Sequence, residues 1–313
     1  DNAGCAAVPT MHNLPLGEAA TALNPGRIAQ VVDLVGLDYY HPANPKHHMT
    51  ILRRTGDLSV RCEGRRVPAY GAEVGAGFPP FFAPLDDRDS LYTLITALAY
   101  GLRGFNLYMA VNRDRWVGAP IDEHGLPRKL ADEYHALIEA LDRVGFSALR
   151  RRVPVRLVVP RALRRLARAT HAFGPVTPAF FNIAGAGPLE SCLEDDLGLL
   201  PRDGSADGES SFAPAAPIAG ESFLRAFERA LLARGVPFAY AGGDSLASSI
   251  EGAAWVVCTT VGGLKRDVLD TLRDARARQG AAITIGPTVP QRDGSMRPLD
   301  RPHDVSELEL EPL

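Results

Sequence analysis

Polar side chains that could do chemistry stand at the ends of strand-like apolar segments in residues 1–128. The clearest candidate is Glu73, whose carboxylate could act as a nucleophile or exchange a proton. It follows an apolar run and precedes Gly75 and Gly77, which predicts a sharp backbone turn directly after it. Tyr40 ends the preceding strand-like segment, so its hydroxyl is expected to keep such a carboxylate charged and correctly aimed. An ordinary exposed glutamate at a strand end is the alternative interpretation.

Further polar and aromatic residues could contact a substrate beside this carboxylate. The candidates are Asn13, Asp38, Tyr39, Asn112, Arg113 and Trp116. Tyr39 is also the fallback for Tyr40 as the partner of the carboxylate. Solvated loop polarity explains most of these residues almost as well, and Trp116 could simply anchor its loop.

Four apolar segments typical of strands must position these residues. They are expected at residues 6–13, 33–40, within 65–75, and at 103–112. Helices are expected at residues 24–32 and 90–102, with Ser90 as the N-cap of the second. Strands that alternate with helices indicate a parallel α/β sheet.

In a (β/α)8 barrel the active site lies at the carboxyl ends of the strands, which is where the candidate residues stand. Four strand–helix units make only half of such a barrel. Half a barrel leaves an unpaired edge on each side and cannot close. We therefore expect residues 1–128 to form the C-terminal half of a (β/α)8 barrel, open or completed by other residues.

The rest of the chain predicts a second α/β layer. A helix at 130–145, ended by Gly145, leads into it. Strands are expected at 153–160, 236–241, 253–260 and 281–287, and helices at 222–235 and 264–280. Residues 201–222 are polar and rich in Gly, Ala and Pro, which is typical of a mobile surface loop. The expected domains are 1–128, a connecting helix within 129–151, and a flavodoxin-like doubly wound domain at 152–313.

Composition narrows the classes of partner. The 313 residues carry 34 basic and 37 acidic side chains, a net charge of −3, so neither nucleic acid nor an anionic membrane surface is the expected partner. No apolar run approaches the ~18 residues that span a membrane. The four cysteines are far apart, which favours free thiols and a cytoplasmic protein. The chain begins without Met, so a targeting segment is not tested by its start.

Other reactive residues predict no second centre. The spacing of His12, His41, His47 and His48 matches no metal motif, so loop histidines and no metal are expected. Cys258 follows a strand, but "VVCTTVGG" is not a nucleophile elbow, and a buried structural thiol is expected. No GxGxxG fingerprint is present, and no cofactor is expected.

Three segments of the first part resemble family 35 β-galactosidases. "VDLVGLDYYHPANP" (32–45) is similar to the sixth barrel strand and its loop, and "VPAYGAEVGAGFPPFFAP" (67–84) to the seventh strand. The stretch from 97 to 137, with "GAPIDEHGLPR", resembles the eighth strand and its exit. The following domain looks more like the amidotransferase-like middle domain of family 42 β-galactosidases.

The resemblance implies a retaining glycosidase in which Glu73 is the nucleophile. A retaining enzyme needs a second carboxyl group about 5–5.5 Å away as its acid/base. In these families that glutamate follows the fourth strand, and residues 6–13 already look like the fifth. Glu18 and Glu63 are present but stand in no suitable motif. Trp116 could stack against the apolar face of a galactose ring.

Three functions follow as hypotheses. The first is a retaining β-galactosidase acting on β-galactosides, with its acid/base outside this chain. The second is a catalytically silent carbohydrate-binding or assembly module. The third, a flavodoxin-like ligand-binding or amidotransferase protein, would need a phosphate loop or a triad in 152–313, and neither is evident. A homo-oligomer, or association with the N-terminal half of the barrel, is the expected assembly.

Overall fold

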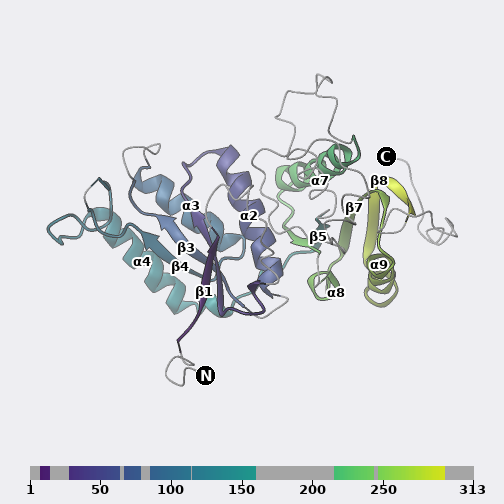
Figure 1. Ribbon diagram of the computed structural model, residues 1–313, viewed down its shortest axis with the longest axis horizontal. Coiled ribbons are helices and arrows are strands. Elements are labelled where there is room, and N and C mark those ends of the chain that lie inside the picture. The colour runs from purple at the N-terminus through teal and green to yellow at the C-terminus, as the bar shows by residue number, and fades with distance from the viewer. Residues whose placement is uncertain are drawn as a thin grey trace, which may run out of the picture. The chain divides into compact units, whose positions relative to one another are not determined.

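The computed structural model contains two compact units, whose main boundary falls between Arg152 and Val153. It describes residues 8–14, 28–63, 67–78, 85–113, 115–159, 215–242 and 246–292. Each unit is built on a four-stranded sheet in which all pairings are parallel (Figure 1). Parallel α/β architecture, as the sequence predicts, is thereby confirmed. Within the described ranges, no helix is long and apolar enough to cross a membrane.

The first sheet has its strands in chain order. They are β1 (Met11–Leu14), β2 (Leu34–Tyr39), β3 (Ala69–Gly75) and β4 (Gly104–Tyr108). The helices that follow β2, β3 and β4 are α2 (Pro45–Glu63), α3 (Asp87–Ala99) and α4 (Lys129–Arg143). Two parallel strands need such a crossover, because the chain must return to the amino-terminal end of the sheet before the next strand begins.

Two local features differ from the sequence prediction. The helix α2 was not expected, although its buried residues recur at helical spacing: Ile51, Thr55, Leu58 and Cys62. The N-cap of α3 is Asp86 rather than Ser90. The Asp86 side chain accepts a hydrogen bond from the backbone N–H of Asp89, the Asp89 carboxylate accepts one from the backbone of Asp86, and Ser90 is buried inside the helix.

The predicted helix at 24–32 is described only in part: Ile28 is helical, and the helix ends before residue 32. Residues 24–27 lie outside the described residues, and residues 29–31 form a turn in which the carbonyl of Ile28 accepts from Val31 and Val32. The strand predicted at 6–13 begins later, at Met11, and continues through Leu14.

Alternation along β2 separates the helix-facing side of the sheet from the other side. Val35, Leu37 and Tyr39 are buried, and the Tyr39 hydroxyl lies 2.8 Å from the Thr55 hydroxyl of α2. Successive side chains on a strand point to opposite faces. Gly36, Asp38 and Tyr40 therefore lie on the face opposite the helices, and this face carries the candidate site.

The second sheet has the order β6-β5-β7-β8. Its strands are β5 (Val155–Val158), β6 (Phe238–Ala241), β7 (Trp255–Gly263) and β8 (Ala282–Arg292), and its helices are α7 (Ala215–Ala233), α8 (Leu246–Ser249) and α9 (Arg266–Gln279). The chain therefore reverses direction across the sheet at β5, as in a doubly wound sheet. The loop predicted at 201–222 is wrong from Ala215 onward, where α7 begins, and residues 201–214 lie outside the described residues.

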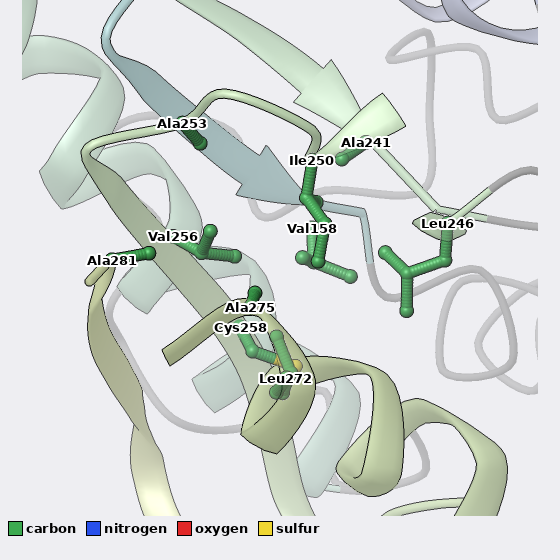
Figure 2. Packing of buried hydrophobic residues seen from close by; sticks show 10 residues of the cluster. All are labelled: Val158, Ala241, Leu246, Ile250, Ala253, Val256, Cys258, Leu272, Ala275 and Ala281. Atoms are coloured by element: carbon green, nitrogen blue, oxygen red, sulfur yellow. The ribbon is translucent and has the colours of Figure 1, made fainter. Parts of the chain in front are cut away.

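An apolar cluster holds α8 and α9 against this sheet. Figure 2 shows Cys258 of β7 pointing toward Leu272 of α9, with Val256 and Ala281 in the same cluster. The Cys258 side chain is 0% exposed, and burial raises the pKa of its thiol to about 12. The expected buried, free thiol is confirmed, and a nucleophilic thiolate is not favoured at this position.

Candidate active site

The candidate site is a carboxylate–phenol pair on neighbouring strands. The Tyr40 hydroxyl donates a hydrogen bond to Oε2 of Glu73 over 2.7 Å, and the pair is partly buried. Glu73 lies in β3 opposite Asp38 of β2, beside an irregularity in the register. The structure therefore brings together the two residues for which the sequence predicts joint roles. A charge-assisted bond of this length fixes the direction in which the Glu73 carboxylate points.

Tyr40 is held as a hydrogen-bond donor by its surroundings. Burial raises the pKa of the Tyr40 hydroxyl far above its usual value, and the hydrogen bond and charge of Glu73 raise that pKa further. The carboxylate of Asp38 acts in the same direction. The phenol thus stays protonated throughout the physiological pH range and can only donate toward Glu73.

The two glycines after Glu73 do not make the turn that the sequence predicts. Neither Gly75 nor Gly77 adopts a left-handed φ. Instead, both allow close approach of other groups. A Cβ at Gly75 would lie 2.9 Å from Cδ1 of Tyr40, and one at Gly77 would lie 3.0 Å from the carbonyl oxygen of Val117. The prediction is corrected: the glycines leave space for neighbours rather than bend the chain.

An aromatic cluster adjoins the pair. The ring of Tyr108, the last residue of β4, lies 6.3 Å from the Tyr40 ring and 5.0 Å from the Trp116 ring, in both cases edge to face. The rings of Tyr40 and Trp116 are 6.5 Å apart. The structure therefore places Trp116 beside Tyr40, the hydrogen-bond partner of Glu73. The sequence does not identify Tyr108, because the apolar run predicts a strand to residue 112, whereas β4 ends at Tyr108.

Asn112 and Arg113 lie in the loop after β4 rather than at its end. The Asn112 side chain accepts a hydrogen bond from the Ala119 backbone over 2.9 Å and donates one to Glu123 over 3.3 Å. Its amide therefore stabilises the loop and is not favoured as a substrate ligand. The carbonyl of Arg113 accepts from the Trp116 backbone over 2.8 Å, so this residue helps to place Trp116.

Tyr39 does not reach the site. Its side chain is 0% exposed and lies on the helix-facing side of β2, which leaves no route to a substrate. The predicted role of Tyr39 in the site is therefore wrong, and its side chain instead makes a buried contact with α2. Asn13 instead lies opposite Gly36 in the register and shares the face of Asp38 and Tyr40. Within the described residues, its side-chain oxygen is buried and has no hydrogen-bond partner.

The histidines lie mainly beside α2. The His41 and His47 rings stack 5.4 Å apart, and the two ring nitrogens of His48 lie at hydrogen-bond distance from the hydroxyls of Tyr92 and Tyr100. Burial, together with the charge of Arg54, lowers the pKa of His41 to about 3. Among the described residues, no group of three His, Cys, Asp or Glu side chains could hold a metal ion.

The side chains of Glu18 and Glu63, the two glutamates that could supply a second catalytic carboxylate, lie outside the described part of the structure. Glu18 lies outside the described residues. Glu63 is the last residue of α2. This helix returns along the sheet, so its end lies toward the amino-terminal ends of the strands, away from the candidate site.

Solved structures show the fold to which the chain is similar. A β-galactosidase from the Antarctic haloarchaeon Halorubrum lacusprofundi is 17% identical over 95% of this chain and 40% of its own, with a TM-score of 0.54. A β-galactosidase from Bacillus circulans sp. alkalophilus is 13% identical over 93% of this chain and 37% of its own, with a TM-score of 0.59. A β-galactosidase from the psychrophilic Marinomonas ef1 is 11% identical over 96% of this chain and 43% of its own, with a TM-score of 0.56.

No protein-family model and no curated protein matches the sequence. At such low identities, the likeness to the solved structures concerns the fold alone. The chain spans about two fifths of the length of the solved structures it matches. The chain thus has the fold found in part of these β-galactosidases.

Proposed function

We propose that this chain carries the nucleophile half of a retaining glycoside hydrolase site that acts on β-galactosides. The observation that carries the proposal is the 2.7 Å hydrogen bond from Tyr40 to Glu73 on the non-helical face of a parallel sheet. Parallel α/β barrels bind substrates at the carboxyl ends of their strands. The fold shared with β-galactosidases supports a sugar as the substrate.

In the proposed reaction, the Glu73 carboxylate attacks the anomeric carbon as the glycosidic C–O bond breaks, and the acid/base outside this chain protonates the leaving oxygen. Water, deprotonated by the same acid/base, then hydrolyses the covalent glycosyl-enzyme. Tyr40 holds the carboxylate in line for the attack. Asp38 and Asn13 share the same face and are proposed to bind sugar hydroxyls. The rings of Tyr108 and Trp116 are proposed to pack on the apolar face of the sugar.

We propose that β1 to β4 form the C-terminal half of a (β/α)8 barrel, with residues 129–151 as a connection and 152–313 as a flavodoxin-like, non-catalytic domain. The outer edges of β1 and β4 have no strand partner in the described sheet. Such edges favour pairing with further strands. A segment or subunit that completes the barrel would bring the acid/base glutamate about 5–5.5 Å from Glu73.

A fluorinated galactosyl inhibitor tests the nucleophile directly. It should label Glu73 in the natural protein, and Glu73→Gln should abolish the label and lower kcat by several orders of magnitude without changing the melting temperature. Asp142→Asn, an exposed change on α4, is the matched control for loss of a carboxylate. Labelling of another residue, with an active Glu73→Gln variant, would refute the assignment.

Leaving groups of different acidity test whether the acid/base lies elsewhere. Residues 1–313 alone should hydrolyse lactose about 10²–10⁴-fold more slowly than the completed barrel, because an alkoxide must be protonated as it leaves. The rate of hydrolysis of a dinitrophenyl galactoside should fall much less, since its phenolate leaves without being protonated. Equal turnover of lactose would show that a second catalytic carboxylate lies within this chain, and Asp38, opposite Glu73 in the sheet, would be the nearest candidate by register.

A catalytically silent carbohydrate-binding module is the second candidate. It is favoured by one observation: among the described residues, no glutamate besides Glu73 joins the Tyr40 pair. Calorimetric titration of residues 1–313 with galactose separates the two. Binding without labelling or turnover, in the natural protein as well as in this chain, would support the silent module.

A further inference from the structure

Gly75 lies on β3 beside the Tyr40 ring. A Cβ built there would meet Cδ1 of Tyr40 at 2.9 Å, Cδ1 of Leu85 at 3.2 Å and the carbonyl oxygen of Tyr39 at 3.3 Å. Side-chain carbon atoms in contact normally stand about 3.5–4.0 Å apart. Any other residue type at position 75 would therefore push the Tyr40 ring or β2 itself outward by roughly 0.6 Å or more.

The displacement acts on the hydrogen bond to Glu73. The Tyr40 ring is bounded by Gly75 on one side and has Tyr108 and Trp116 as aromatic neighbours. A ring displaced from Gly75 must re-pack among these groups, and its hydroxyl moves with it. Because the bond is directional and only 2.7 Å long, a small tilt of the ring lengthens and bends it.

We propose that Gly75 is a positioning residue that seats Tyr40 at hydrogen-bond distance from the nucleophile, an inference that rests on the proposed function of Glu73. Its backbone φ is not left-handed, so conformational freedom does not explain a glycine there. The absence of a side chain does, because the space that a Cβ would fill is occupied by the Tyr40 ring. Gly75 thus acts on Glu73 through Tyr40.

A double-mutant cycle tests whether Gly75 acts on Glu73 through Tyr40. Gly75→Ala should lower kcat for a dinitrophenyl galactoside about 10- to 150-fold, as loss of a hydrogen bond to a charged group does, with KM changed less than threefold. Tyr40→Phe should lower kcat to the same extent. In the Tyr40→Phe background, Gly75→Ala should have almost no further effect, since the bond it disrupts is already gone.

Gly104→Ala is the matched control. Its Cβ would lie 2.8 Å from Cδ2 of Tyr70, a glycine–aromatic contact of the same kind in the same sheet but at the amino-terminal ends of the strands. It should lower the melting temperature but leave kcat per folded molecule unchanged. If Gly75→Ala fails to fold, Gly75→Ala with Leu85→Ala relieves the second contact, and the same non-additivity with Tyr40→Phe is expected.

Structural and kinetic outcomes are separable. Additive losses in the cycle, or full activity of Gly75→Ala, would overturn the role of Gly75 even where the inhibitor labels Glu73. Failure to label Glu73 would remove the proposed function. The positioning itself is then decided by a crystal structure of Gly75→Ala. An Oη to Oε2 distance beyond 3.5 Å supports it, and an unchanged distance near 2.7 Å refutes it.

Discussion

Tyr40→Phe removes one oxygen atom and leaves the ring in place, so it isolates the hydrogen bond to Glu73. That bond is 2.7 Å long, partly buried and directed at a carboxylate. Hydrogen bonds to charged groups contribute about 1.5–3 kcal/mol. If the bond serves to aim the nucleophile, this energy is lost in the transition state, and kcat/KM should fall about 10- to 150-fold.

The neighbouring tyrosine supplies the control. Tyr39→Phe removes a hydroxyl that lies 2.8 Å from Thr55, on the opposite face of β2 and fully buried. It should lower the free energy of unfolding by about 1 kcal/mol and leave kcat/KM unchanged. Hydrolysis of a dinitrophenyl galactoside and urea unfolding measure the two quantities. If Tyr40→Phe keeps kcat/KM within threefold of the wild type, the Tyr40 bond does not serve catalysis.

Two further predictions concern groups outside the proposed chemistry. His41, whose pKa falls from 6.5 to about 3, stays neutral in the fold, so stability is lost as the pH drops below 6.5, where only the unfolded chain takes up the proton. From pH 8 to pH 5, the free energy of unfolding, measured with urea, should fall by about 2 kcal/mol less in His41→Gln than in the wild type. An equal fall in both proteins would contradict this. Cys258→Ser should lower the melting temperature yet keep activity within about twofold, and a selective fall in kcat would show that the second unit takes part in the chemistry.

The sequence predicts the strands of both units well because apolar runs bounded by Gly, Pro and polar residues are a local signal. Prediction failed where the structure depends on contacts between distant segments. The helix α2 carries Arg54 on a buried face, where average hydropathy suggests exposure. The cap of α3 is a local exception: Ser90 is a favoured cap residue, but Asp86 and Asp89, three positions apart, form the capping box.

In the candidate site, too, local sequence signals are predictable and contacts between distant segments are not. Glu73 and Tyr40 could be predicted because strand ends in a parallel sheet converge, so residue type and position in the strand suffice. Which of the two adjacent tyrosines faces the carboxylate depends on which face of β2 each side chain occupies. The sequence does not show this, so Tyr39 remained a candidate both as partner of Glu73 and as a substrate ligand. The place of Gly75 could not be predicted, because its neighbour Tyr40 lies 35 positions away along the chain.

A second carboxylate–phenol pair shows why geometry alone does not make an active site. In the second unit, the Tyr240 hydroxyl donates to Glu228 over 2.7 Å, the same length as the bond between Tyr40 and Glu73. Glu228 is 0% exposed between α7 and the sheet, so no sugar can reach it. Its hydrogen bond satisfies a buried polar group and contributes to stability. Glu73 has the same partner chemistry, but it is only partly buried, and its partner Tyr40 lies beside the ring of Trp116, so the proposed substrate could reach this carboxylate.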